Sequence, residues 1–270
     1  SRFAITKGLR IKIVSFVCIA MSIFHLYIAS PIGVMPSNKV RMVHLAFVLV
    51  LIFLLFPMFK SKDKKDKTTP FDYILAVLGV IANMYLFFNI DAISMRAGVM
   101  TELDFVMAIL TVILVLEATR RCIGAPLTIL AIIALLYAYL GPNLPGALMH
   151  RGFGIKRLAE HMYISAEGIY GIPLGVSATV IFLFILFGAF LAETGLSKFF
   201  TNVALGFAGH KVGGPAKVSI ISSGLLGMIN GSAAANVVTT GAFTIPLMKR
   251  LGYKPYIAAQ LRLLLLPEVK

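Results

Sequence analysis

The chain has 270 residues, of which 59% are apolar, and its mean hydropathy is +0.92. Soluble globular domains are about 45–50% apolar, so these values exclude a soluble domain and indicate an integral membrane protein. Lys and Arg outnumber Asp and Glu by 25 to 11. The basic residues lie in short stretches between apolar runs, which is typical of membrane topology, so no nucleic-acid partner is expected. The two cysteines, Cys18 and Cys122, match no disulfide or metal-binding pattern.

Six apolar segments are predicted to cross the lipid bilayer as helices, so the expected fold is all-α. Basic residues before the first segment place the N-terminus in the cytoplasm, and this segment is interpreted as an anchor because no cleavable signal peptide is visible. Short outer loops are expected at 31–41 and 91–104, and a highly charged cytoplasmic loop at 60–67. The predicted spans cover about 13–29, 43–59, 71–90, 105–119, 126–140 and 174–191.

Two further segments are predicted to be amphipathic helices rather than spans. Between His150 and Ser165, apolar residues recur at helical spacing, and basic and acidic residues occupy the opposite face. This segment is interpreted either as a helix lying in the membrane interface or as an ordinary packed loop helix. The second amphipathic segment is expected at 197–208 and leads to the most unusual stretch of the chain.

That stretch, 213–254, consists of two apolar arms joined by a small polar linker. Each arm, 218–229 and 237–248, has about 12 residues or roughly 18 Å of helix, which is too short for a hydrocarbon core of roughly 30 Å. Basic residues flank both ends. The sequence therefore predicts a re-entrant hairpin that enters and leaves on the cytoplasmic side, and a broken segment of this kind is a pointer to a transporter's binding site.

The count of Lys and Arg favours this hairpin over a single span. With the hairpin, predicted cytoplasmic stretches carry 17 basic residues and outer stretches carry 6. If 218–248 were one span, Lys249, Arg250 and Lys254 would move outside, and the bias would weaken to 14 against 9.

The linker has the chemistry of an ion and substrate site. The first arm would present carbonyl groups and the negative end of its dipole, which suits Na⁺, and the second would present amide N–H groups, which suit a carboxylate. Ser232 and Asn236 add polar side chains, and Na⁺ is expected at Gly231, Ser232 and Asn236. The alternative is small-residue helix packing. Thr239 is expected either to face the cavity or to bond its own helix. The predicted substrate- and cation-binding residues are Asn230, Gly231, Ser232, Ala233, Ala234, Asn236 and Thr239.

Other polar residues in or near the spans have simpler interpretations. Glu117 and Glu193 lie at span ends, where a local ion pair or an interfacial position accounts for them, although an intramembrane ionisable group is also a functional candidate. Asn83, a polar residue within a predicted span, is a weaker candidate. His25 is interpreted as a satisfied helix-packing residue rather than a ligand.

Several motifs resemble the large membrane subunit of TRAP transporters, the tripartite ATP-independent periplasmic transporters. They are the run Gly231-Ser232-Ala233-Ala234-Ala235-Asn236, the run Ile245-Pro246-Leu247-Met248-Lys249-Arg250-Leu251-Gly252-Tyr253, and upstream Ile172-Pro173-Leu174 with Gly188-Ala189-Phe190-Leu191-Ala192-Glu193-Thr194-Gly195. By its layout alone, 1–121 resembles the four-span small subunit fused in front, as in the TAXI branch. The expected domains are 1–121 and 122–260.

The resemblance implies a permease of the bacterial or archaeal inner membrane, driven by an ion gradient, with Na⁺ as coupling ion and no other cofactor. Its substrate would be an organic anion or carboxylate delivered by a periplasmic binding protein. A membrane scaffold subunit and a membrane-embedded enzyme are the alternatives. No nucleophile–base set, metal cluster or phosphate loop in the sequence favours an enzyme.

The resemblance ends after Gln260, where the family continues V-E-A-x-A-S-T-G-G and this chain has Leu261-Arg262-Leu263-Leu264-Leu265-Leu266-Pro267-Glu268-Val269. A coding strand for V-E-A-A-A-S-T-G-G, read one base later, gives this same run of nine residues. Residues 261–270 are therefore expected to be an out-of-frame tail, and the 270-residue chain is expected to be inactive alone.

Overall fold

The computed structural model describes residues 9–58, 69–96, 99–209, 213–227, 245, 248, 249 and 256. Regular structure in these residues is helical, and none of them lies in a strand. The prediction of an all-α membrane protein is thereby confirmed. The chain divides into two compact units, Ser1–Thr179 and Val180–Lys270, each of which is described by itself. The predicted boundary at 121/122 lies within the first unit, and the division into two domains stays a prediction.

Five helices of the described chain are long and apolar enough to cross a membrane. They are Arg10–Ala29, Ser37–Leu55, Pro70–Met95, Ala125–Asn143 and Ile172–Leu191. These correspond to five of the six predicted spans. The remaining one, α4 (Glu102–Cys122), has 21 residues but carries charges at both ends. Its uncharged stretch between Asp104 and Glu117 is therefore shorter than in the other five helices.

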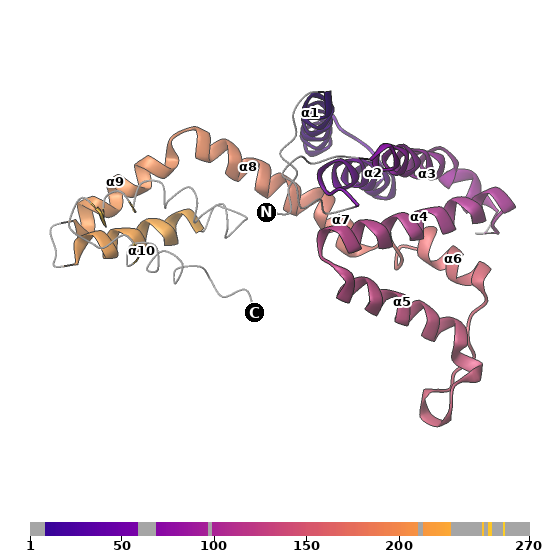
Figure 1. Ribbon diagram of the computed structural model, residues 1–270. Helices are drawn as coiled ribbons and strands as arrows, with labels where there is room; N and C mark the ends of the chain where they lie inside the picture. Colours follow the sequence, from indigo (N-terminus) through magenta and orange to yellow (C-terminus); the bar gives the residue numbers. More distant parts are fainter. Residues whose placement is uncertain are drawn as a thin grey trace. The chain divides into compact units, whose positions relative to one another are not determined.

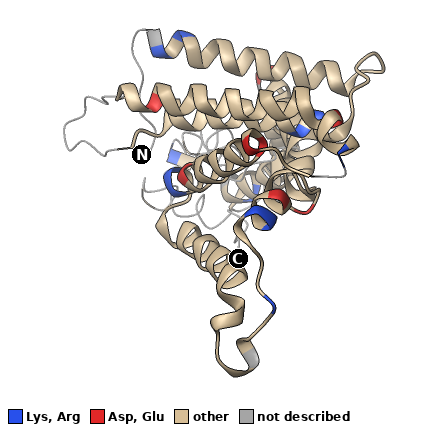
Figure 2. Cartoon of the chain, turned by 90° about the vertical axis from the view of Figure 1, so that its right-hand side faces the viewer, with Lys and Arg blue, Asp and Glu red and all other residues tan. Residues whose placement is uncertain are grey.

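The first unit contains α1 (Leu9–Ala29), α2 (Ser37–Leu55), α3 (Pro70–Met95), α4, α5 (Ala125–Leu140), α6 (Ile155–Tyr163) and α7 (Ile172–Val176). As Figure 1 shows, α2 packs along α3, α1 packs on α2, and α4 contacts α3, α5 and α6. The core between these helices is apolar and includes Leu49, Phe53, Leu86 and Leu114. Figure 2 shows the charged residues near helix ends, with long uncharged middles, as bilayer-spanning helices require.

Capping side chains set the starts of α3 and α4. The backbone N–H of Thr69 donates to Asp72 over 3.0 Å. At α4, Thr101 and Asp104 form a reciprocal capping box, with N–H to side-chain oxygen distances of 2.8 and 3.2 Å. These caps occupy backbone donors that the first helical turn leaves without partners.

The predicted outer loops are shorter than expected, because the flanking helices are longer. Helix α2 begins at Ser37 rather than at 43, and α3 continues to Met95 rather than ending at 90. Helix α4 begins at Glu102. The polar residues in these added turns are compatible with helix because they pair with one another, as the 2.7 Å contact between Lys39 and Asp91 illustrates.

Helix α5 and one face of α1 are exposed to a degree that only a lipid environment accommodates. Of the 16 residues of α5, all of them described, Thr128 alone is buried. On α1, Phe16 and Ile23 are 72% and 62% exposed. So many exposed large apolar side chains are expected to contact lipid acyl chains, because their exposure to water would be energetically unfavourable.

The predicted amphipathic helix at 150–165 is observed as α6. Ala159 and Tyr163 are buried in the core of the first unit, and Tyr163 donates its hydroxyl to the carbonyl oxygen of Ala82 over 2.9 Å. This face therefore packs against protein, as in the loop-helix interpretation. Ile155 is 51% exposed and leaves an apolar side chain at the helix start for the interface.

The second unit holds α8 (Phe182–Glu193), α9 (Leu196–Ala208) and α10 (Gly214–Gly227). A π-helical turn, η3 (Ser177–Ile181), precedes α8. Gly195 and Gly213 precede α9 and α10 with φ of +83° and +73°, which glycine adopts without strain. Helix α9 packs on α10 through Ala204, Ala208 and Val218, and this confirms the second amphipathic helix.

Candidate substrate and ion site

The residues predicted for the site all lie outside the described residues. This holds for Asn230, Gly231, Ser232, Ala233, Ala234, Asn236 and Thr239. Their roles, and the hairpin that contains them, stay predictions. The structure does describe most of the predicted first arm as α10, whose 14 residues correspond to about 21 Å of helix. The start of α10 lies close to the end of α9, since a Cβ on Gly214 would lie 2.6 Å from the carbonyl oxygen of Gly209.

One face of α10 carries buried hydroxyl groups that sequence reasoning missed. Ser219, Ser222 and Ser223 are at most 5% exposed and lie on the same face as Val218. Ser222 donates to the carbonyl oxygen of Ser219 over 3.3 Å. The hydroxyl of Ser219 is buried and has no hydrogen-bond partner within the part of the chain that the structure describes. The i, i+3, i+4 spacing of these serines could have indicated a polar helix face.

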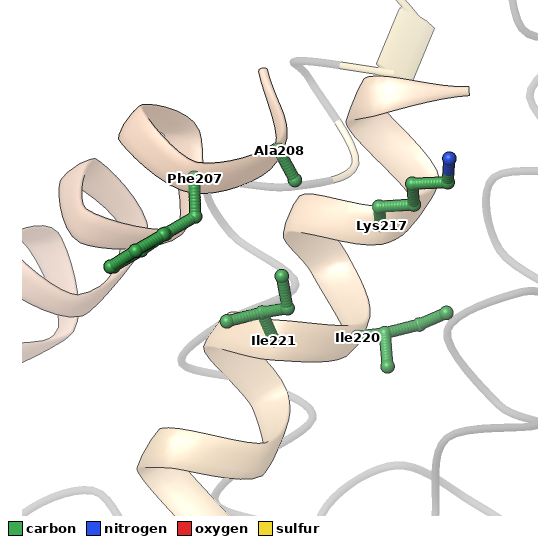
Figure 3. Close-up of a pocket in the computed structure, with 5 residues that line it drawn as sticks. All are labelled: Phe207, Ala208, Lys217, Ile220 and Ile221. Carbon is green, nitrogen blue, oxygen red and sulfur yellow. The ribbon is translucent and has the colours of Figure 1, made fainter. Parts of the chain in front are cut away.

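The opposite face of α10 borders a groove with a different character. Phe207 and Ala208 of α9, with Lys217, Ile220 and Ile221 of α10, line a space of about 530 Å³ (Figure 3). Figure 3 shows one polar side chain, that of Lys217, among four apolar ones. A site for a polar solute needs several convergent polar groups, so this groove is not the predicted substrate site.

In the first unit, a buried polar network connects α2 and α3 to the segment between α6 and α7. Arg41 of α2 donates to the carbonyl oxygen of Tyr170 over 2.8 Å. The Tyr170 hydroxyl donates to Asn83 of α3 over 2.8 Å, and the Asn83 amide donates to the carbonyl oxygen of Gly79. Burial raises the pKa of Tyr163 and of Tyr170, so both stay protonated as donors. Asn83 is thus a satisfied structural residue in the described chain.

A second network of charges connects α2, α3 and α4. Arg121 donates to Asp72 over 2.7 Å and to the carbonyl oxygen of Phe56 over 3.0 Å. Glu117 accepts from Arg121 and from Arg120, both over 2.7 Å. The interpretation of Glu117 as a member of a local ion pair is confirmed, whereas the partner Asp72, which lies 49 residues from Arg121, was not predicted.

Two remaining residues also have defined surroundings. His25 is 2% exposed and contacts the carbonyl oxygen of Met21 over 2.7 Å, which confirms its interpretation as a satisfied packing residue. Glu193 is exposed at the end of α8.

Sequence comparisons connect this fold with a transporter family. The family described as "Tripartite ATP-independent periplasmic transporter, DctM component" matches residues 110–262, which is more than half of the 270-residue chain. The matched region contains α10 and every predicted site residue. No solved structure matches the chain significantly.

Curated relatives from three bacteria agree with this match. A TRAP transporter large permease protein of Haemophilus influenzae is 32% identical over 109 residues, 40% of this chain and 24% of the relative. The 2,3-diketo-L-gulonate TRAP transporter large permease protein YiaN of Escherichia coli is 31% identical over 109 residues, with the same two shares. The C4-dicarboxylate TRAP transporter large permease protein DctM of Rhodobacter capsulatus is 34% identical over 76 residues, 28% of this chain and 17% of the relative.

The chain thus spans about a quarter or less of the length of these relatives. Membership of a transporter family also supports the prediction that the chain is not an enzyme. With its spanning helices and the match over 110–262, the chain is a multi-pass membrane protein that belongs to the DctM component of the tripartite ATP-independent periplasmic transporters.

Proposed function

We propose that this chain is the N-terminal part of a fused TRAP permease of the inner membrane, in which a small-subunit-like segment precedes the large-subunit-like one. The observation that carries the proposal is the family match over 110–262, which includes the predicted hairpin. The helices α1 to α3 lie before this region, as a fused small subunit requires. The hydrogen bonds of Arg41 and Asn83 with Tyr170 support one folded unit that includes both the small-subunit-like and the large-subunit-like segment.

The proposed activity is import of an organic carboxylate, driven by a Na⁺ gradient and supplied by a periplasmic binding protein. Two relatives carry the names of carboxylates, a C4-dicarboxylate and 2,3-diketo-L-gulonate. At the predicted tip, carbonyl groups at the end of one arm suit Na⁺, and N–H groups at the start of the other suit a carboxylate. A scaffold subunit would need no polar linker at membrane depth.

Replacing Ser232 by Val in a full-length permease that contains this chain, with its binding protein present, tests this site. Loss of one oxygen from the cation's surroundings should raise the Na⁺ concentration for half-maximal carboxylate uptake by roughly threefold to tenfold, or about 0.7–1.4 kcal/mol. Expression should be unchanged. Ser22→Val is the matched control, because Ser22 lies on α1 and, within the described residues, donates to the carbonyl oxygen of Cys18 on its own helix. An unaltered Na⁺ dependence in Ser232→Val would refute the assignment.

The hairpin itself predicts that both ends of 213–254 face the cytoplasm. In a variant without Cys18 and Cys122, single cysteines at Ser197 and Tyr253 should both resist an impermeant thiol reagent added to intact cells. A cysteine at Asn143, which is exposed and follows the outer end of the predicted span 126–140, should react under the same conditions. Reaction at Tyr253→Cys with protection at Ser197→Cys would replace the hairpin by a span.

A further inference from the structure

A chain of three side chains crosses the first unit from α1 to the π-helical turn η3. His25 Nε2 lies 2.8 Å from His44 Nδ1, and His44 Nε2 lies 3.1 Å from the Ser177 hydroxyl. At the other end, His25 Nδ1 lies 2.7 Å from the carbonyl oxygen of Met21. Both rings are 2% exposed, and they meet edge to face with centroids 4.9 Å apart.

The hydrogen bonds of this chain define where each proton lies when both rings are neutral. A carbonyl oxygen only accepts, so His25 Nδ1 carries the proton and His25 Nε2 accepts. His44 Nδ1 must therefore donate to His25, which leaves His44 Nε2 as an acceptor for the Ser177 hydroxyl. Each contact in the chain is then satisfied with a single tautomer of each ring.

One additional proton fits into the same arrangement without moving a ring. If His44 Nε2 is protonated, it donates to the Ser177 oxygen, and the hydroxyl turns from donor to acceptor. A serine hydroxyl in a helix can then donate to the carbonyl group four residues earlier, here that of Pro173. The proton between the two rings can also transfer across the 2.8 Å contact, so the charge is shared by the pair.

A second proton does not fit. It would place two N–H groups against each other across the same 2.8 Å contact, together with two positive charges. Among neighbouring charged groups, Arg41 lies three residues before His44 on α2 and donates to Tyr170, and its charge opposes protonation further. Lys39 and Asp91, on α2 and α3, form an ion pair. Arg10 and Lys12 lie at the opposite end of α1, and the described segment Ile172–Ile181 has no titratable side chain.

We propose that His25 and His44 together form a binding site for one proton, which is transmitted to Ser177 of the π-helical turn. The site joins α1 and α2 to the span Ile172–Leu191, which lies within the region of the family match. His44 and Ser177, which make this connection, are 133 positions apart. Its proton converts the contact between His44 and Ser177 from a neutral to a charge-assisted hydrogen bond, which is stronger. Single π-turns often occur at functional sites of helices. This proposal does not depend on the transport function proposed above.

Nitrogen-15 NMR of the histidine rings, recorded on the full chain in lipid nanodiscs between about pH 4 and 9, tests the site, because imidazole ordinarily titrates near 6.5. His25→Gln and His44→Gln assign the two rings among the five histidines. Both rings should respond in one common step that adds a single proton to the pair.

Two variants at Ser177 test the link to the π-turn. Ser177→Ala removes the acceptor for the added proton and should lower the midpoint of the common step by about one pH unit or more. Ser177→Thr keeps the hydroxyl and should leave the midpoint where it is. Two separate steps that each add a proton, rings that stay neutral down to about pH 4, or an unchanged midpoint in Ser177→Ala would each overturn the proposal.

Discussion

Asp72→Asn should destabilise the first unit by about 1.5–3 kcal/mol, because the buried Arg121 keeps its ion pair with Glu117 but loses the carboxylate charge of Asp72. The side chains of Asp72 and Arg121 are 0% and 2% exposed, and their charged atoms are 2.7 Å apart. Asp72 also accepts from the backbone N–H of Thr69 at the start of α3. The asparagine retains a carbonyl oxygen for one of these contacts but supplies no charge to Arg121.

The free energy of unfolding of the membrane-reconstituted protein, measured by denaturation with SDS, checks this expectation. Asp91→Asn is the matched control, because the same substitution there breaks the pair with Lys39, where Asp91 is 69% exposed. Exposed pairs contribute about 0–1 kcal/mol, so the control should remain close to the unchanged protein. Equal losses in both variants would show that burial of the Asp72–Arg121 pair has no special role.

Asn83→Leu should cost about 1–3 kcal/mol, because it leaves the buried hydroxyl of Tyr170 without an acceptor. Tyr170→Phe should cost a similar amount by leaving the Asn83 oxygen unpaired. The double variant removes both groups, so its loss should be clearly smaller than the sum of the two single losses. The contact joins residues 87 positions apart over 2.8 Å.

The free energy of unfolding in SDS, measured for Asn83→Leu, Tyr170→Phe and the double variant, gives the coupling energy between the two residues. Asn89→Leu is the control on α3, because Asn89 donates to the carbonyl oxygen of Tyr85 on its own helix over 2.8 Å and to no other helix among the described residues. It should show no coupling with Tyr170→Phe. Strictly additive losses for Asn83 and Tyr170 would mean that this hydrogen bond does not help to hold the α6–α7 segment on α3.

Both variants act at contacts that hold the first unit together, and one of these contacts crosses the predicted domain boundary at 121/122. Asp72 and Arg121 join helices before that boundary, whereas Asn83 and Tyr170 join one helix before it to a segment after it. In a fused permease, this second contact would replace part of the interface between two separate subunits. The contact between Asn83 and Tyr170 is therefore expected both to stabilise the first unit and to connect the two parts of the proposed fusion.

The sequence by itself determined most of the spans of this protein, because an apolar run is a local property, but it placed the starts of α2 and α4 several residues too late. An apolar run long enough for the bilayer is visible without knowledge of the fold. The capping pairs Thr69–Asp72 and Thr101–Asp104 are local too, with partners three residues apart, although they were not predicted. The amphipathic pattern of α9 and the motifs that resemble the family are likewise local. Of the site, the sequence supplied the candidates at 230–239, and these stay predictions.

Only the tertiary structure decided how the polar side chains inside the first unit are partnered. Glu117 could be paired correctly from sequence, because its partners follow within four residues. Asp72 with Arg121, and His44 with Ser177, could not, because these residues are 49 and 133 positions apart. A buried polar group must find a partner, but its sequence position does not say which helix supplies it. Helix packing makes that choice, since it determines which residues distant in the chain come within hydrogen-bond distance.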